Sequence, residues 1–435
     1  MRIFDSSEIE TAIDRLSRKA EADENVINTA RSIVRDVAKR GDEALFEYTI
    51  RFDGFSLNAD NIRVTQREIE EAYAAVPAEL LDALKKSAQN VSAFHQLQKR
   101  EGYEKRSGGA VTGRIVLPIQ RAGVYVPGGT AAYPSSVLMN IIPAKIAGVE
   151  QIIMATPPGK SGVIEPLTLV AADVAGADMI LKIGGAQAVA ALTYGTQSVP
   201  KVDLITGPGN AYVSAAKREV YGLVGIDIIA GPSEVLIIAD EHANPVYAAA
   251  DFLSQAEHDA KAASILLTPS KAQAEQAAAE IERQLALLPR RDIAAQSVAD
   301  YGTIVVTRTL DEAFDIANRM APEHLEILTE NPRDGLAKVR NAGAVFLGAY
   351  SPEPLGDYFA GPNHVLPTSG NARFSSPLSV DAFTKTMNYI EYDRGSLEAC
   401  YLDIDRFARA EGLTAHARSA AIRFTDEPFE REETR

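Results

Sequence analysis

The sequence predicts an α/β protein with largely parallel β-sheets. Short β-rich runs alternate with Ala-rich helical runs of about ten residues or more, which is the pattern of βαβ units. Charged, amphipathic helical sequence precedes and follows this alternating region. A Pro- and Gly-rich turn at residues 229–235, "IAGPSEV", lies near the middle of the expected strands and is a plausible crossing between domains.

The elements follow in order along the chain. Residues 1–105 are expected to be helical, with capping-box spacing at Ser7 and Glu10 and again at Thr65 and Glu68. Eight strands are expected at residues 122–127, 151–156, 179–183, 202–206, 234–239, 263–268, 302–307 and 343–348. They could form one wide sheet, a barrel or two smaller sheets, and the turn in their middle favours two sheets. After residue 373 the sequence is again charged and helix-rich, and it ends in a charged tail.

Composition limits the function classes. The net charge of −15 argues against a nucleic-acid-binding surface, which requires clustered Lys and Arg. No run of about 18 apolar residues predicts a transmembrane helix, and the N-terminus lacks the apolar core of a signal peptide. The single cysteine, Cys400, excludes an intramolecular disulfide framework and a Cys-rich zinc site. A cytoplasmic location is therefore expected, without nucleic-acid or membrane partners.

Three strand-to-helix junctions are glycine-rich, at residues 126–136, 182–192 and 205–218. Glycines at such turns let the backbone approach a ligand, and the following helix N-terminus favours an anion such as pyrophosphate. None of the three is a full G-x-G-x-x-G motif. In the last of them, Gly207-Pro208-Gly209 is followed by Tyr212 where the third glycine would be. Each could be an ordinary tight turn, but three in one half of the chain favour a dinucleotide or phosphorylated ligand.

A metal site is suggested by scattered nitrogen and oxygen donors. Gln255 and His258 are three apart on an expected helix and share a face, although a solvated helix surface would look the same. The irregular loop at residues 351–370 contains Asp357 and His364, and long irregular loops of this kind are often functional.

Glu411 and His416 are five residues apart. Their side chains could line the same wall of a site only if a helix begins between them, with Thr414 as a plausible N-cap. Gln255, His258, Asp357 and His416 would make a site without thiolates. Zinc would fit it with positions left open for substrate, and manganese or cobalt could compete.

The stretch "MAPEHLEIL" at residues 320–328 places two chemically active side chains together. Pro322 suits a first helical turn, so Glu323 and His324 are expected at the start of a helix. Adjacent helical residues point about 100° apart and could act on different protons of one substrate. A helix N-terminus would stabilise the carboxylate and lower the histidine pKa. A pair that merely complements the helix dipole is the alternative.

Five motifs together closely resemble the histidinol dehydrogenase family over essentially the whole chain. They are "AGPSEVLIIAD", "LSQAEHD", "APEHLEI", "GDYFAGPNHVLPT" and "EGLTAH". The resemblance implies two incomplete Rossmann-like domains, with N- and C-terminal extensions that cross to the partner of a homodimer. The implied parts are an N-terminal helical segment (1–110, partly packed on the second α/β domain), an NAD-side domain (111–239), a domain with the metal and the catalytic bases (240–372) and a C-terminal helical extension (373–435).

The same resemblance implies the reaction and the residue roles. Members are NAD-dependent dehydrogenases that oxidise L-histidinol to L-histidine through a bound aldehyde. They use two NAD and one zinc per subunit, in the last steps of histidine biosynthesis. By motif position, the zinc ligands are Gln255, His258, Asp357 and His416, the catalytic bases Glu323 and His324, the further substrate contacts Ser233, His364 and Glu411, and the NAD contacts Tyr125, Gln187 and Asn210.

Mechanistic expectations follow from this assignment. His324 would take the hydroxyl proton in the first oxidation, and Glu323 would activate water to hydrate the aldehyde for the second. Cys400 is expected to pack rather than to form a thiohemiacetal. Glu411 and His416 would complete the site of the neighbouring subunit. Two alternatives stay open: another small polar alcohol as substrate, or a metal-binding structural or regulatory protein without NAD, against which Gln187 and Asn210 count.

Overall fold

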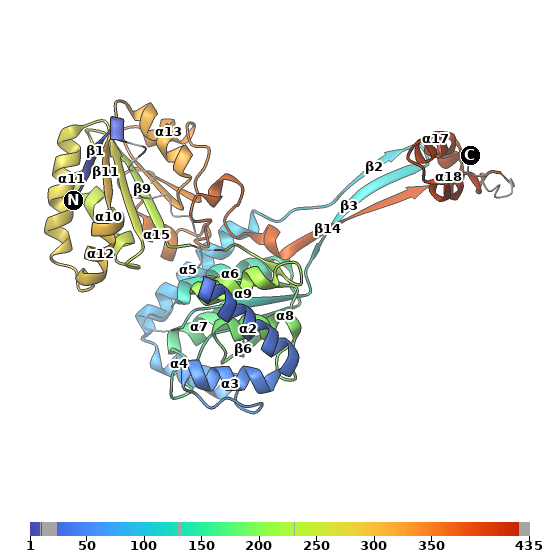
Figure 1. The fold of residues 1–435 in the computed structure, drawn as a ribbon, viewed down its shortest axis with the longest axis horizontal. Coiled ribbons are helices and arrows are strands. Elements are labelled where there is room, and N and C mark those ends of the chain that lie inside the picture. The colour runs from blue at the N-terminus through green and yellow to red at the C-terminus, as the bar shows by residue number, and fades with distance from the viewer. Residues whose placement is uncertain (9, 11–23, 129–132, 230, 426–435) are drawn as a thin grey trace. The chain divides into compact units, whose positions relative to one another are not determined.

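The computed structural model describes residues 1–8, 10, 24–128, 133–229 and 231–425 (Figure 1). Two compact units divide the chain. The first unit combines Met1–Lys99 with Pro118–Phe383, and the second combines Arg100–Leu117 with Thr384–Arg435. The first unit contains two parallel sheets, so the expected pair of sheets is confirmed.

One sheet of the first unit has five strands in the order β6-β5-β4-β7-β8, all parallel. The strands are β4 (Arg121–Tyr125), β5 (Gln151–Ala155), β6 (Met179–Leu181), β7 (Leu204–Thr206) and β8 (Gly225–Ile226). Helices cover both faces, so alternate side chains of one strand enter different cores. In β5, Ile152 and Met154 face one core while Ile153 and Ala155 face the other.

The helices on this sheet form two sets. One core includes α4 (Gln66–Ala75), α5 (Ala78–Gln96), α6 (Pro134–Ala147) and α7 (Pro166–Ala175). The other includes α2 (Glu24–Arg40), α3 (Asp42–Asp53), α8 (Gly185–Tyr194) and α9 (Ala211–Val220). The expected capping box at the start of α4 is confirmed, because Thr65 and Glu68 each bond the backbone N–H of the other. The helix expected after Ser7 and Glu10 falls on residues 11–23, outside the described part of the chain, so its capping box stays a prediction.

The second sheet of the first unit has six parallel strands in the order β1-β11-β10-β9-β12-β13. They are β1 (Ile3–Asp5), β9 (Glu234–Ala239), β10 (Ala263–Thr268), β11 (Thr303–Val306), β12 (His324–Leu328) and β13 (Ala344–Leu347). One core packs against α10 (Pro245–Ala256), α11 (Lys271–Leu285) and α12 (Arg291–Tyr301). The other packs against α13 (Leu310–Met320). The shorter elements are η1 (Ser6–Glu8), α14 (Pro332–Leu336), α15 (Glu353–Tyr358), η2 (Asn371–Arg373) and η3 (Val380–Phe383).

The second unit is a three-stranded ribbon with helices at one end (Figure 1). Its strands are β2 (Tyr103–Ser107), β3 (Ala110–Pro118) and β14 (Thr384–Tyr392), in the order β14-β3-β2. Its helices are α16 (Arg394–Glu398), α17 (Tyr401–Ala410) and α18 (Thr414–Ala421). Gly113 of β3 lies directly against the Tyr389 ring of β14, where a Cβ would come within 2.2 Å of the ring.

All eight expected strands are present, and the chain passes from the five-stranded to the six-stranded sheet between β8 and β9, at the expected turn. Some elements differ from expectation. The N-terminal segment also contributes β1, and the segment after residue 373 contains β14 as well as helices. Strand β9 falls within the predicted NAD-side domain (111–239). In the structure it pairs with β10 and β12 and so belongs to the six-stranded sheet. The domain boundaries themselves stay predictions.

Candidate active site

Two glycine turns lie at the carboxyl edge of the five-stranded sheet. After β7, Gly207 has a φ of 108°, and a Cβ there would lie 1.9 Å from the Tyr125 carbonyl oxygen, so only glycine fits. The turn ends at Asn210, whose Oδ1 accepts hydrogen bonds from the N–H groups of Tyr212 (3.0 Å) and Val213 (3.1 Å). Asn210 therefore caps α9 and sits where the helix N-terminus favours an anion.

The turn between β6 and α8 brings together Tyr125 and Gln187. The Tyr125 hydroxyl accepts a hydrogen bond from the Gly185 N–H at 3.1 Å, and burial raises the pKa of Tyr125 to about 12. Gln187 is buried, yet neither atom of its amide has a hydrogen-bond partner among the residues that the structure describes. A buried amide without partners is unfavourable, so this position is suited to a ligand that supplies them. The third glycine turn falls partly on residues 129–132, outside the described part.

The expectation that residues 322–328 begin a helix is wrong. Helix α13 ends at Met320, Ala321 adopts a left-handed φ of 52°, and His324 is the first residue of strand β12. His324 pairs in register with Val235 of β9 and Ala344 of β13. A short apolar run such as residues 324–328 is compatible with either a helix or a strand. Here the segment is a strand because it pairs with a neighbouring strand on each side.

The backbone of one residue, Glu234, holds both Glu323 and His324, the acid–histidine pair. The Glu234 N–H donates to the Glu323 carboxylate at 3.0 Å, and the Glu234 carbonyl accepts from Nδ1 of His324 at 3.0 Å. Because a carbonyl only accepts, the proton of a neutral His324 is on Nδ1 and the lone pair is on Nε2. That Nε2 is buried and has no partner within the described structure, so it is a base available for a substrate proton.

The electrostatics of Glu323 are also the reverse of the expectation. A helix N-terminus would stabilise its charge, whereas burial here raises the pKa of Glu323 to about 7. His324 opposes this shift, with Nδ1 lying 3.8 Å from the carboxylate. A carboxyl group that titrates near neutral pH can both take and return a proton during turnover.

Metal-ligating side chains converge beside this pair. Ligand atoms of His258, Glu353 and Asp357 all lie within 4.8 Å of one another. Helix α10 ends at Ala256, so His258 lies just past its end rather than within it, and its N–H donates to the Gln255 carbonyl at 3.2 Å. The Gln255 side chain is buried and its Oε1 is unpartnered in the part of the chain that the structure covers. The sequence reasoning missed Glu353, although it stands within the loop singled out for Asp357.

A layer of carboxyl groups continues from Glu353. The Glu353 N–H donates to Oε1 of Glu326 at 2.8 Å, and its own carboxylate accepts from the Ser254 hydroxyl at 3.0 Å. Burial raises the pKa of Glu353 to about 7 and of Asp251 to about 6, and it raises the pKa of Glu326 well above the usual range. A nearby cation would favour the ionised form of such groups.

His364 connects the two halves of the first unit. Its Nδ1 donates to the Asp357 carbonyl at 3.1 Å, so a neutral ring accepts at Nε2, from the Ser136 hydroxyl of α6 at 3.3 Å. Burial lowers the pKa of His364, which favours the neutral ring. Ser136 was not expected, because a serine in the first turn of a helix carries no local sign of a partner far along the chain. Ser233 lies just before β9, and its carbonyl accepts from the Ala263 N–H at 3.0 Å.

The remaining two candidates belong to the second unit. Glu411 is the residue after α17, and His416 is in the first turn of α18, so a helix does begin between them. The expected cap is wrong by one residue. Gly412, with a φ of 75°, ends the turn after α17, and Leu413 is the cap while Thr414 is the first helical residue. Both candidates are exposed in the second unit.

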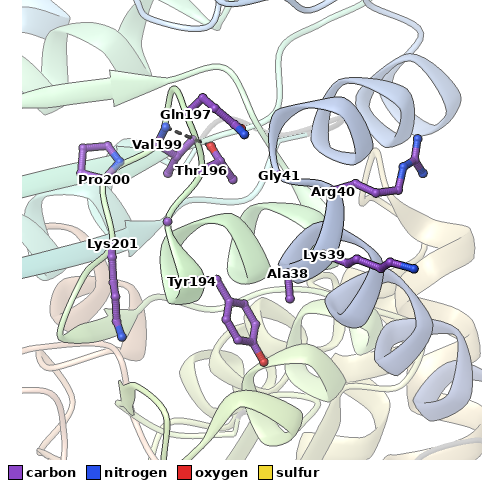
Figure 2. Close-up of a pocket in the computed structure, with 11 residues that line it drawn as sticks. Ala38, Lys39, Arg40, Gly41, Tyr194, Thr196, Gln197, Val199, Pro200 and Lys201 are labelled. Atoms are coloured by element: carbon purple, nitrogen blue, oxygen red, sulfur yellow. Dashed lines mark hydrogen bonds between the residues drawn. The ribbon is translucent and has the colours of Figure 1, made fainter.

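The other histidines are ordinary, as expected. His95 is buried in α5 and donates from Nδ1 to the Val91 carbonyl at 2.8 Å, and His242 is exposed in a loop. A hollow of about 560 Å³ lies between Arg40 and Lys201, with Tyr194 on its wall (Figure 2). It is at the amino edge of the five-stranded sheet, opposite the glycine turns, and contains none of the candidate residues.

These features together indicate an NAD-dependent dehydrogenase. They are the glycine turns with an unpartnered amide at one sheet edge, the buried histidine base and the metal-ligating group. The family model "Histidinol dehydrogenase" matches residues 16–424. The chain belongs to the histidinol dehydrogenase family and is an NAD-dependent oxidoreductase of that family.

Relatives cover nearly the whole chain. Histidinol dehydrogenase of Heliobacterium mobile is 53% identical over 409 residues, which are 94% of this chain and 96% of the relative. That of Halalkalibacterium halodurans is 54% identical over 92% of this chain and 94% of the relative. The crystal structure of histidinol dehydrogenase from Elizabethkingia anophelis superposes with a TM-score of 0.91 at 40% identity, covering 97% of this chain and 98% of that one. Within the described residues, no helix is long and apolar enough to span a membrane.

Proposed function

We propose that this chain oxidises L-histidinol to L-histidine in two successive NAD-dependent steps at one zinc site per subunit. The observation that carries the proposal is the pair of hydrogen bonds made by the Glu234 backbone N–H and carbonyl. It fixes the His324 tautomer with a free Nε2 and holds Glu323 in a buried position beside it. A base with a free lone pair and a carboxyl group that titrates near neutral pH suit a reaction with two different proton transfers.

Zinc is proposed to bind Gln255, His258, Asp357 and His416. The donor set contains nitrogen and oxygen atoms without thiolate, which zinc accepts. The unpartnered Oε1 of Gln255 and the close approach of His258 to Asp357 support this choice. When bound, zinc would hold the amine and the imidazole of the substrate. Glu353 is not among the proposed ligands, and it is well placed to orient His258 or Asp357 from behind.

In the first oxidation, Nε2 of His324 takes the hydroxyl proton while the substrate carbon loses hydride to NAD, which gives the aldehyde. Glu323 then takes a proton from water as that water adds to the aldehyde carbon, and protonated His324 returns its proton to the aldehyde oxygen, which gives the diol and regenerates the His324 base. His324 takes a hydroxyl proton of the resulting diol as a second hydride leaves for the second NAD. The products are the carboxylic acid and two NADH, and each oxidation releases one proton.

A hydrated aldehyde is preferred to a thiohemiacetal because the only thiol is engaged elsewhere. Sγ of Cys400 lies 3.5 Å from the Ser396 carbonyl and 3.6 Å from that of Leu397, within its own helical region. This geometry is that of a packed thiol with weak local hydrogen bonds.

Substrate and cofactor contacts complete the proposal. Ser233, His364 and Glu411 are proposed to bind the amino alcohol, and the neutral His364 suits a polar contact without added charge. Tyr125, Gln187 and Asn210 are proposed to bind NAD, and the unpartnered Gln187 amide supports this role.

The working form is proposed to be a cytoplasmic homodimer in which Glu411 and His416 complete the site of the partner subunit. The second unit buries few apolar side chains, while Phe407 (71% exposed) and Ile390 (76% exposed) are open to solvent. Apolar exposure of this kind is typical of a surface covered by a partner, and a second copy of this chain is the proposed partner.

Counting NADH per histidinol consumed tests the reaction. Two NADH, lost with a chelator and restored by zinc, are expected. One NADH would mean that the aldehyde escapes and the Glu323 role is wrong, and none would point to another small polar alcohol as substrate. In single-turnover assays, Glu323→Gln should slow aldehyde oxidation more than alcohol oxidation, whereas His324→Asn should slow both. Equal losses in both half-reactions for Glu323→Gln would contradict separate roles for the pair.

A further inference from the structure

A buried ion pair lies behind the β7–α9 turn. Lys217 of α9 pairs with Asp227, in the loop after β8, and their side chains are only 4% and 2% exposed. Neither residue is among the proposed catalytic, metal or cofactor contacts. A buried ion pair gains little stability over an apolar pair of similar size, because both charges lose their hydration. The hydrogen bonds that Lys217 and Asp227 make to the neighbouring backbone indicate a role other than stability.

The pair holds both polar groups of one glycine. Oδ2 of Asp227 accepts from the Gly207 N–H at 2.7 Å, and Nζ of Lys217 donates to the Gly207 carbonyl at 3.1 Å. Nζ also donates to the Ile228 carbonyl at 2.9 Å, which ties the turn to the start of the crossing between the two sheets. Gly207 is the residue whose left-handed conformation lets the turn pass the Tyr125 carbonyl.

We propose that Lys217 and Asp227 together are the positioning residues of the NAD-binding turn, an inference that rests on the proposed function, in which NAD binds at this turn. Two residues, Pro208 and Gly209, separate Gly207 from Asn210 in this turn. A glycine turn without these hydrogen bonds has many accessible conformations. The ion pair selects one of them before NAD arrives, so binding does not have to order the turn.

The proposal predicts that removing the pair weakens cofactor binding selectively. In the double variant Lys217→Met/Asp227→Asn no buried charge is left unpaired, and the amide oxygen of Asn still accepts from Gly207. The Kd for NADH should rise about tenfold or more, since loss of preorganisation is paid on binding. Histidinol binding and zinc content should stay as in the wild type, and kcat at saturating NAD should change by less than about threefold.

NADH fluorescence titration measures the Kd directly, and the absence of tryptophan removes tryptophan emission from the background. The matched control is Arg31→Met/Glu219→Gln, which removes the ion pair between α2 and α9 (3.0 Å) on the same helix without touching the turn. Its NADH Kd should equal that of the wild type. Asn210→Ala tests the underlying contact and should also weaken NADH binding.

The outcomes separate the two proposals. If Asn210→Ala weakens NADH binding and Lys217→Met/Asp227→Asn does not, the positioning role is wrong. If only Asn210→Ala is without effect, the Asn210 contact is wrong and the positioning role stands. Parallel losses of NADH, histidinol and zinc binding would show a merely structural pair and overturn the proposal. Should the double variant not fold, Lys217→Gln/Asp227→Asn, which also leaves no buried charge and keeps a polar side chain at both positions, must still raise the NADH Kd, by about threefold, with zinc content unchanged.

Discussion

Replacing Glu323 by Gln should make the metal-free protein more stable at alkaline pH. Gln has nearly the same shape and keeps an oxygen for the Glu234 N–H, which lies 3.0 Å from the carboxylate. What it removes is a negative charge in a buried position. Burial raises the pKa of Glu323 from 4.5 to about 7, so the ionised form is less stable in the folded protein than in the unfolded chain.

The magnitude follows from the two pKa values. The folded pKa lies above the unfolded one, so the stability of the neutral group is fully present below pH 4.5 and is lost as pH rises through about 7. At about pH 8.5 the buried ionised carboxylate costs about 3 kcal/mol, and at about pH 5.5, where the folded protein keeps this carboxyl group protonated, the group costs about 1 kcal/mol. The free energy of unfolding of the variant should exceed that of the wild type by these amounts.

Urea unfolding in EDTA, followed by circular dichroism at about pH 5.5 and 8.5, measures the difference. Lower pH is avoided because the isoelectric point is about 5.0. The control is Glu241→Gln, whose side chain is 64% exposed and whose replacement should leave stability unchanged. A Glu323→Gln protein no more stable than the wild type at pH 8.5, or a difference independent of pH, would refute the argument that burial sets the charge of this carboxyl group.

Three further outcomes are expected. Gln187→Leu removes a buried amide without partners, so it should stabilise the cofactor-free protein by about 1–3 kcal/mol, seen as a higher Tm. The same change should abolish the stabilisation by NADH, and thermal unfolding with and without NADH measures both effects. Gly207→Ala places a Cβ 1.9 Å from the Tyr125 carbonyl oxygen at a φ of 108°, so it should destabilise the protein by about 3 kcal/mol or more, seen as a lower urea midpoint. Glu353→Gln should weaken zinc binding by about 10–100-fold in a chelator competition, because Glu353 lies against His258 and Asp357, and an unchanged affinity would remove it from the metal environment.

Eight strands of the two sheets were predictable because parallel strands covered on both faces are continuous apolar runs, whereas the short strands β1 and β8 and strand β12 were not predicted. Residues 151–155 and 234–239 are of this kind, and both were located correctly. Strand β14 was missed for the opposite reason. Its side chains are mostly exposed, so its sequence "TKTMNYIEY" has neither a continuous apolar run nor a clean alternation.

The candidate residues could be named from motifs, but their geometry could not. The carboxyl edge of a parallel sheet is the usual ligand edge, and the glycine turns of the five-stranded sheet lie there. Glu234 and His324 instead begin their strands, so the acid–histidine pair lies at the amino edge of the six-stranded sheet. No local pattern predicts that choice, because it depends on which loops of distant sequence meet at that edge.

The sequence by itself determined the alternation of strands and helices, the glycine turns and the set of candidate residues for chemistry, since each depends on local side-chain chemistry and spacing. Only the tertiary structure decided the charge of Glu323, the tautomer of His324 and the presence of Glu353 beside His258. These properties depend on burial and on partners far along the chain, such as the backbone N–H and carbonyl of Glu234. Electrostatic free energies depend on the local dielectric environment and on hydrogen-bond partners, and both exist only once the chain has folded.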